Sequence, residues 1–199
     1  MKIVIIKYNA GNIESVNNAL NRLGVNAEIT ADPDKIRNAD KVIFPGVGEA
    51  STTMNYLRKH NLDQLIVSLK QPVLGICLGL QLMCSHSEEG DTQCLGIFDE
   101  KVKRFIPNPG EEYITKVPHM GWNAISNLKS NLFTSAQENQ YVYFVHSYYA
   151  GLGEHTAATC NYIVPFSAAL QKDNFYATQF HPEKSGSVGA EILKNFLNL

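Results

Sequence analysis

The first half of the chain alternates short apolar runs with segments whose apolar residues recur at helical spacing. Residues 3–6 are Ile-Val-Ile-Ile, a β-branched run typical of a strand that is covered on both faces in a parallel sheet. Residues 13–23 place apolar side chains at helical spacing and stop at Gly24, a common helix terminator. We therefore expect a central first strand followed by a helix.

The same alternation continues to residue 83. Further strands are predicted over 25–29, 41–44 and 73–76, a short helical turn at 32–34, and helical segments from 49 to 70 and from 78 to 83. This order predicts a doubly wound α/β fold with a mostly parallel central sheet and helices on both faces. In such folds, sites form beyond the carboxyl ends of the strands.

From residue 97 onward the chain changes to short alternating segments separated by polar and Pro/Gly turns. Antiparallel strands are predicted over 102–106, 114–117, 122–125, 141–145 and 168–171, then a last strand over 175–180 and an amphipathic helix over 188–197. Because no long linker or low-complexity stretch intervenes, we interpret these strands as an added antiparallel layer. Residues 1–199 are expected to form a single domain.

Composition narrows the kinds of partner. A chain of 199 residues that is 44% hydrophobic can bury one good core. A net charge of −2, with 17 basic and 19 acidic residues and no basic run, gives no footprint for nucleic acid or an anionic membrane surface. Nothing approaches the roughly 20 apolar residues that cross a bilayer. We expect a soluble protein with a small-molecule or protein partner.

The cysteines indicate a reducing compartment. Cys77, Cys84, Cys94 and Cys160 show no C-x-x-C spacing, and no charged segment precedes a full-length apolar signal region. Both features suit the cytoplasm. Cys84, His86 and Cys94 lack the spacing of a zinc site, so we expect no metal there. No cofactor is expected either.

Cys77 stands at the predicted turn between the strand over 73–76 and the helix over 78–83. Gly75 and Gly79 remove the β-carbons that would clash in this turn, giving G-x-C-x-G, a cysteine version of the nucleophile elbow. Such a turn is expected to lift the sulfur out of the fold, at a helix N-terminus that favours the thiolate. The alternative is a small core residue, as for most unpaired cysteines in apolar runs.

A second motif, His181-Pro182-Glu183, follows the last predicted strand. Pro182 favours an extended conformation at His181, in which side chains two residues apart point the same way. His181 and Glu183 should therefore be neighbours, as the base and orienting carboxylate of a nucleophilic triad that Cys77 would complete. The alternative is a polar strand end beside a solvated carboxylate.

Residues 45–48, Pro-Gly-Val-Gly, form a third motif after a predicted strand. Two glycines around one residue allow backbone N–H groups to turn towards a developing oxyanion. The motif is weak alone, because Pro-Gly is usually only a turn.

Together these motifs resemble the class I, or triad-type, glutamine amidotransferases. The matching stretches are 8–12, 45–48, 75–81, 116–123, 144–149 and 179–185. The elbow and H-P-E are shared by all triad amidotransferases, whereas P-G-V-G and K-V-P-H-M-G-W-N point to the glutaminase subunits of imidazole glycerol phosphate synthase. Lys7 and Asn9 depart from that family, which more often has aspartate and glycine there, in a loop expected near the partner.

The resemblance implies roles for these residues. Cys77 attacks the glutamine side-chain amide, His181 protonates the leaving ammonia and then activates water against the γ-glutamyl thioester, and Glu183 orients His181. The implied oxyanion donors are the backbone N–H groups of Val47 and Leu78, and the implied substrate-binding residues are Gly48, Gln81, Ser147 and Tyr148. His119 and His146 are expected to be structural or interface residues rather than bases.

The resemblance also implies a partner. Ammonia in neutral water is mostly protonated and no longer nucleophilic, so it must pass along a shielded path to an acceptor that this chain lacks. The implied acceptor is a (β/α)8-barrel cyclase subunit in a heterodimer, which makes imidazole glycerol phosphate and an aminoimidazole carboxamide ribotide in histidine biosynthesis. The implied docking residues are Asn12, Met120, Trp122 and Lys184; for Trp122 the alternative is a core aromatic.

Two rival interpretations remain. One is a paralogous amidotransferase that feeds another barrel synthase, for example in the making of an amidino sugar. The other is a non-catalytic scaffold of the same fold, against which Cys77, His181 and Glu183 together argue.

Overall fold

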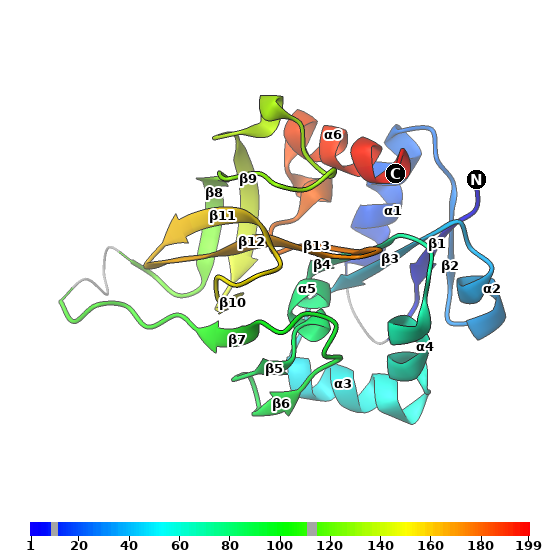
Figure 1. The fold of residues 1–199 in the computed structure, drawn as a ribbon, viewed down its shortest axis with the longest axis horizontal. Helices are drawn as coiled ribbons and strands as arrows, with labels where there is room; N and C mark the ends of the chain where they lie inside the picture. The colour runs from blue at the N-terminus through cyan, green and yellow to red at the C-terminus, as the bar shows by residue number, and fades with distance from the viewer. Residues whose placement is uncertain (9–11, 111–114) are drawn as a thin grey trace.

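The computed structural model describes residues 1–8, 12–110 and 115–199, which are built around a seven-stranded sheet (Figure 1). The strand order is β11-β12-β13-β4-β3-β1-β2. The strands are β1 (Ile3–Ile6), β2 (Ala27–Thr30), β3 (Lys41–Gly46), β4 (Val73–Cys77), β11 (Thr156–Tyr162), β12 (Val164–Lys172) and β13 (Phe175–Thr178). The five from β13 to β2 are parallel, and β11 and β12 are antiparallel. The predicted mostly parallel sheet is confirmed.

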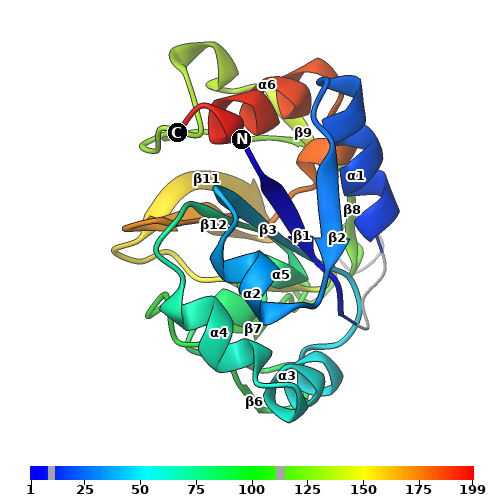
Figure 2. The ribbon, with the colours of Figure 1, turned by 90° about the vertical axis from the view of Figure 1, so that its right-hand side faces the viewer.

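Helices cover both faces of this sheet, as the doubly wound class requires (Figures 1 and 2). One face carries α1 (Ile13–Arg22) and α6 (Gly186–Leu197). The other carries α2 (Pro33–Arg37), α3 (Ala50–Lys59), α4 (Leu62–Ser68) and α5 (Leu78–Met83). The described residues also form two short 3-10 helices, η1 (Ser135–Gln137) and η2 (Pro182–Lys184).

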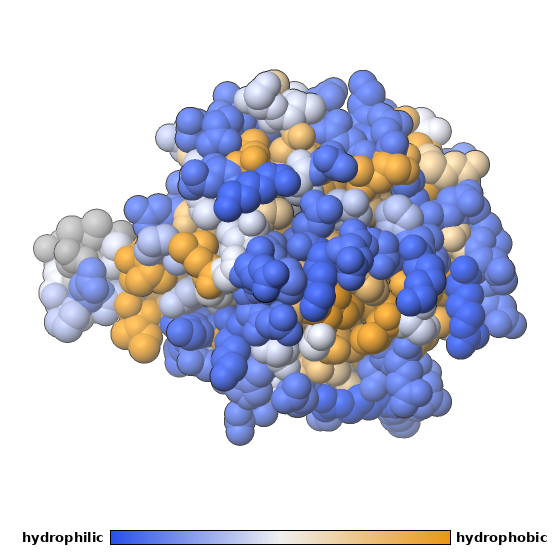
Figure 3. All heavy atoms as spheres, viewed as in Figure 1, coloured by the Kyte–Doolittle hydropathy of each residue, from blue (hydrophilic) through white to orange (hydrophobic). Residues whose placement is uncertain are grey.

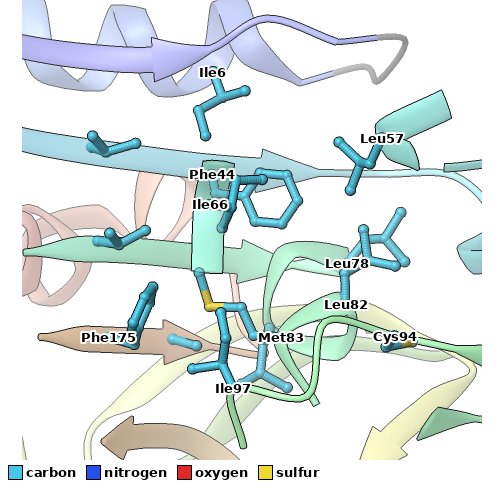
Figure 4. Close-up of a cluster of buried hydrophobic side chains, with 14 of the residues drawn as sticks. Ile6, Phe44, Leu57, Ile66, Leu78, Leu82, Met83, Cys94, Ile97 and Phe175 are labelled. Atoms are coloured by element: carbon cyan, nitrogen blue, oxygen red, sulfur yellow. The ribbon is translucent and has the colours of Figure 1, made fainter. Parts of the chain in front are cut away.

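The run at residues 3–6 is wholly apolar because it supplies two cores at once. Ile3 and Ile5 belong to the hydrophobic cluster under α1 and α6, whereas Val4 and Ile6 belong to the cluster under α3, α4 and α5 (Figure 4). Successive side chains of a strand point to opposite faces, so a strand between two helical layers must be apolar at every position. All four side chains are buried.

Strand β4 is the central strand of the sheet, and its position determines where the site lies. The first strand is interior, paired with β2 and β3, but it lies next to the edge strand and not at the centre. The parallel neighbours of β4 are β3 and β13, so their carboxyl ends share one edge of the sheet. Three predicted motifs lie at or just beyond these ends, namely residues 45–48, Cys77 and residues 181–183. The third strand does not break at Pro45 as predicted, because Pro45 and Gly46 still pair with β4.

The added antiparallel strands differ in detail from the prediction. They form two small sheets and also extend the central one. The two-stranded sheet pairs β8 (His119–Ala124) with β9 (Tyr141–His146). The four-stranded sheet contains β10 (Tyr148–Ala150), β7 (Lys101–Arg104), β5 (His86–Ser87) and β6 (Thr92–Gln93), and its β5–β7 pair is parallel. The extension is the β11–β12 hairpin, of which the sequence predicts only residues 168–171.

Two predicted strand positions are wrong. Residues 115–117 form no strand, and residue 114 lies outside the described residues; the strand begins at His119, after a proline that cannot donate to a ladder. The last strand ends at Thr178 rather than at residue 180. Strand β11 was not predicted because Thr-Ala-Ala-Thr-Cys offers neither large apolar residues nor clear alternation.

The face of the molecule in Figure 3 is mainly polar, with hydrophobic residues gathered in separate patches among hydrophilic ones. Among the described residues, no helix has the length and apolar character needed to span a membrane.

Candidate active site

Cys77 occupies a strained turn between β4 and α5. Its backbone has φ 55° and ψ −107°, a conformation that residues with a side chain rarely adopt. The flanking glycines are needed for packing: a β-carbon at Gly79 would lie 2.1 Å from the Phe44 carbonyl oxygen, and one at Gly75 would lie 2.9 Å from Met83 Sδ. The predicted G-x-C-x-G elbow is present.

The sulfur is less exposed than predicted. Cys77 is only 7% exposed, because other segments cover the turn. The Val145 carbonyl oxygen lies 3.9 Å from Sγ, and Gln179 Nε2 lies 3.8 Å from it. The expectation that the elbow lifts the thiol out of the fold is therefore wrong in this respect: Cys77 is buried and opens onto a cavity.

This cavity, of about 240 Å³, gathers most of the predicted site. Its lining residues are Val47, Gly48, Cys77, Leu78, Gln81, Glu89, Val145, His146, Ser147 and Tyr148. Both implied oxyanion residues and all four implied substrate residues therefore lie around the nucleophile.

His181 and Glu183 are in contact, as predicted. His181 Nδ1 lies 2.7 Å from Glu183 Oε1, and both side chains are buried. The backbone conformation that brings them together differs from the prediction, because only His181 is extended, whereas Pro182 and Glu183 belong to the 3-10 helix η2. Strand β9 fixes the histidine backbone, since the His181 N–H donates to the Tyr143 carbonyl at 2.9 Å.

The second ring nitrogen of His181 is available for chemistry. Nε2 is buried and has no hydrogen bond of normal geometry to a described residue. Burial lowers the pKa of His181, but the charge of Cys77 and contacts to Cys77 and Glu183 outweigh burial and raise the pKa to about 10. An imidazole with this pKa is protonated at neutral pH and can deliver a proton near Cys77.

The side-chain amide nitrogen of Gln81 makes hydrogen bonds within the protein. Gln81 Nε2 donates to the Tyr148 carbonyl at 2.9 Å and to Gln179 Oε1 at 3.0 Å. Both of its N–H groups are therefore used internally. Any bond from Gln81 to a substrate must come from its carbonyl oxygen.

Glu89 lines the cavity, although no motif in the sequence distinguishes it. It lies in a polar loop and is the only acidic side chain among the described residues that line the cavity. Burial raises the pKa of Glu89. The Ala50 N–H, which donates to Oε2 at 2.8 Å, acts in the opposite direction but has the smaller effect. A half-buried carboxylate at this place can pair with an ammonium group.

His119 and His146 form a buried pair beside the cavity. His119 Nδ1 lies 3.0 Å from His146 Nε2, and His146 Nδ1 donates to the Tyr148 carbonyl at 2.7 Å. Burial lowers the pKa of His119 to about 4, and burial with the charges of His119 and His181 lowers the pKa of His146 to about 3. Neutral, hydrogen-bonded imidazoles fit the predicted structural role.

The other cysteines are buried thiols. Burial is the largest cause that raises the pKa of each: well above the usual range for Cys84, to about 11 for Cys94 and to about 12 for Cys160. Cys84 lies in the core, as predicted, and its thiol donates to the Leu80 carbonyl. Within the described residues, no cluster of three or more His, Cys, Asp or Glu side chains could hold a metal ion.

The implied docking residues divide into two kinds. Met120 and Trp122, on the same face of β8, are 63% and 54% exposed, so the alternative that Trp122 is a core aromatic is wrong. Lys184 is also exposed. Asn12 is half-buried and donates to Glu183, a contact that the sequence did not predict. Asn9 lies outside the described residues.

Known proteins of similar sequence identify the family. The family profile "Glutamine amidotransferase class-I" matches residues 4–199. The imidazole glycerol phosphate synthase subunit HisH of Bacteroides fragilis strain YCH46 is 64% identical over 199 residues, covering 100% of both chains. HisH of Haemophilus influenzae strain Rd is 48% identical, covering 99% of this chain and 97% of its own, and HisH of Escherichia coli K12 is 45% identical, covering 100% of both.

Solved structures share the fold at lower identity. A putative GMP synthase subunit from Thermoplasma acidophilum has a TM-score of 0.73 at 22% identity and covers 100% of this chain and 93% of its own. A crystal structure of a glutamine amidotransferase has a TM-score of 0.74 at 17% identity, covering 98% and 97%. The sequence relatives and the shared fold lead to one assignment. The chain belongs to the class I glutamine amidotransferases and, within them, to the HisH family of imidazole glycerol phosphate synthase subunits.

Proposed function

We propose that Cys77, His181 and Glu183 are the residues with which this glutamine amidotransferase subunit hydrolyses L-glutamine to glutamate and ammonia. The observation that carries the proposal is that two motifs far apart in the sequence supply interacting side chains: His181 interacts with Cys77 of the strained elbow, and its Nδ1 lies 2.7 Å from Glu183. Interaction with Cys77 is one of the causes that raise the pKa of His181 to about 10, which supports His181 as the proton donor beside Cys77.

In the first half-reaction the Cys77 thiolate attacks the side-chain amide carbon of glutamine. The carbonyl oxygen becomes an oxyanion, which the backbone N–H groups of Val47 and Leu78 stabilise. His181 gives its Nε2 proton to the amide nitrogen, the C–N bond breaks, and ammonia leaves a γ-glutamyl thioester.

In the second half-reaction His181, now neutral, accepts a proton from water. The resulting hydroxide attacks the thioester carbon, the C–S bond breaks, and glutamate and the Cys77 thiolate are released. Glu183 keeps Nδ1 protonated throughout, so that Nε2 performs both transfers.

The cavity supplies groups for the amino-acid end of the substrate. Glu89 is suited to the α-ammonium group, since it is the acidic residue of the lining. The Gln81 carbonyl oxygen can accept from the substrate because its amide nitrogen is occupied. Gly48, Ser147 and Tyr148 complete the binding site in this proposal.

Ammonia then passes to a (β/α)8-barrel cyclase subunit in a heterodimer, for use in histidine biosynthesis. The names of the relatives support a multi-subunit enzyme, because each is a subunit of imidazole glycerol phosphate synthase. The exposed apolar side chains of Met120 and Trp122 support a docking face on β8. Four free cysteines support a cytoplasmic location.

Glutamine turnover by the free subunit, by the complex with the cyclase subunit, and by the complex with its nucleotide tests the proposal. The free subunit should be slow if the Val47 N–H points away from the oxyanion before docking, since one missing donor costs about 2.7–4 kcal/mol, or roughly a hundred- to thousandfold. Cys77→Ala should abolish turnover, whereas Cys84→Ala should retain it. Full turnover by Cys77→Ala would refute the triad, and equal rates in all three states would refute the switch.

A further inference from the structure

Asn12 makes direct contact with the predicted base and its carboxylate. Asn12 Nδ2 donates to Glu183 Oε1 at 2.6 Å and lies 3.4 Å from His181 Nδ1. The same oxygen lies 2.7 Å from His181 Nδ1. Two donors from opposite ends of the chain therefore converge on one carboxylate oxygen.

No described residue orients the other oxygen of Glu183. Glu183 Oε2 is buried and has no hydrogen-bond partner among the described residues. A carboxylate that is held only by His181 could rotate about its last torsion, since this torsion is broad in glutamate. Asn12 supplies the second contact that limits this rotation.

The backbone of Asn12 is arranged for this contact and not for helix capping. Asn12 precedes α1 with φ 71° and ψ 0°, and its side chain makes no capping hydrogen bond. An asparagine at this position usually accepts from a free N–H of the first turn and stabilises the helix. Asparagine also tolerates the left-handed region better than most residues. The Asn12 side chain does not cap α1 and donates to Glu183 instead.

We propose that Asn12 is a positioning residue of the triad: its amide fixes the Glu183 carboxylate, which keeps His181 Nδ1–H directed at Glu183 and Nε2 directed at Cys77. The proposal rests on the proposed function of Cys77, His181 and Glu183. Asn12 does not touch the reacting atoms. Its effect passes through the orientation of His181.

Substitution of Asn12 separates this role from a role in folding. Asn12→Gly removes the amide and accepts the left-handed backbone, and Asn12→Asp keeps the shape but replaces a donor by an anion. Asn61 is a matched control, because it precedes α4 with φ 54°, lies in the left-handed region and makes no capping bond with its side chain. Asn61→Gly and Asn61→Asp therefore make the same backbone changes away from the triad.

The first readout is the pH dependence of Cys77 alkylation by iodoacetamide, measured on the subunit without its partner. The ionisable groups that act on His181 are Cys77 from the β4–α5 turn and Glu183 from η2, and His146 from β9 interacts with it. Asn12→Asp adds a negative charge, so the alkaline limb of the profile should move to higher pH. Asn12→Gly loosens Glu183, so this limb should move to lower pH. The Asn61 variants should match the wild type.

The second readout is glutamine turnover in the complex. Asn12→Gly should lower kcat by about a hundredfold, the effect of a misplacement of about 1 Å, with little change of KM. Wild-type kcat and wild-type alkylation in both Asn12 variants would overturn the proposal. A lower kcat with an unshifted alkylation profile would also overturn it, because the effect would not pass through His181. If the wild type does not hydrolyse glutamine at all, the proposed function fails while alkylation still reports on Asn12.

Discussion

The Tyr8 hydroxyl donates a hydrogen bond to the Pro45 carbonyl oxygen at 2.5 Å, and this bond ties the segment after β1 to the start of the predicted oxyanion loop. Burial and the charge of Cys77 raise the pKa of Tyr8 well above its usual range, so the hydroxyl remains a donor. The same hydroxyl would lie 2.6 Å from a β-carbon at Gly46. Together with the Leu78 β-carbon, which would lie 2.9 Å away, Tyr8 leaves room only for glycine at residue 46 of the loop that carries Val47.

We expect Tyr8→Phe to weaken this anchor. The Pro45 carbonyl would lose its buried partner, which costs about 1–3 kcal/mol in the free energy of unfolding. Urea unfolding measures this loss, and kcat for glutamine should fall with it because Val47 is less well held. Tyr56→Phe, on the surface helix α3, is the control and should change neither quantity appreciably. Equal stability of the two variants would mean that the Tyr8 bond contributes nothing.

The strained turn at Cys77 gives a prediction about stability. Cys77→Ala and Cys77→Gly should both be inactive, because each lacks the thiol. Cys77→Gly should be the more stable by about 1 kcal/mol, because glycine adopts a positive φ without the strain of a β-carbon. Thermal or urea unfolding of the two inactive variants measures which of them is the more stable. Greater stability of Cys77→Ala would show that the turn imposes no strain on a side chain.

The motifs that the sequence predicted best are those whose residues lie close together in the chain. The elbow around Cys77 spans only residues 75–79, although the Phe44 carbonyl that occupies the space beside Gly79 comes from β3. The contact between His181 and Glu183 spans two residues, so it survived the change from an extended segment to a 3-10 helix.

Features that depend on distant segments were not predictable from one sequence. Asn12 and Glu183 are 171 residues apart, and no spacing rule links them. Glu89 lies in the turn between β5 and β6 and lines the cavity, although its neighbours form no motif. Cys77 is covered by Val145 and Gln179, which a local interpretation of the elbow does not include.

The base and the orienting carboxylate should differ in the size of their effects. His181→Ala removes both proton transfers and should leave almost no turnover. Glu183→Gln keeps an oxygen that can accept from His181 and Asn12 but loses the negative charge, so measurable activity should remain. The two variants are compared by their steady-state kcat for glutamine in the complex. Equal losses would mean that the charge of Glu183 is as important as the base, and no loss in Glu183→Gln would remove it from the triad.

Glu89 should act on binding more than on chemistry. Glu89→Gln removes the negative charge that pairs with the α-ammonium group of glutamine in our proposal, so KM should rise about tenfold or more, because a hydrogen bond to a charged group contributes about 1.5–3 kcal/mol. The kcat should change little. Glu88→Gln, in the neighbouring exposed position, is the control. A fall in kcat at unchanged KM would place Glu89 in the chemical step instead.

The buried pair of His119 and His146 should make the protein sensitive to acid. Their pKa values in the folded protein, about 4 and about 3, lie below the ordinary histidine value of 6.5. Between pH 6.5 and these lower values the unfolded chain therefore binds more protons than the folded protein, and the free energy of unfolding decreases as the pH falls. The expected loss between pH 7 and pH 5 is roughly 2 kcal/mol for each histidine. Urea unfolding at both pH values should therefore show a smaller pH dependence in His119→Gln than in the wild type. His60→Gln, a change to an exposed histidine, should keep the full pH dependence. If His119→Gln loses as much stability on acidification as the wild type, the pair is not the source of the acid sensitivity.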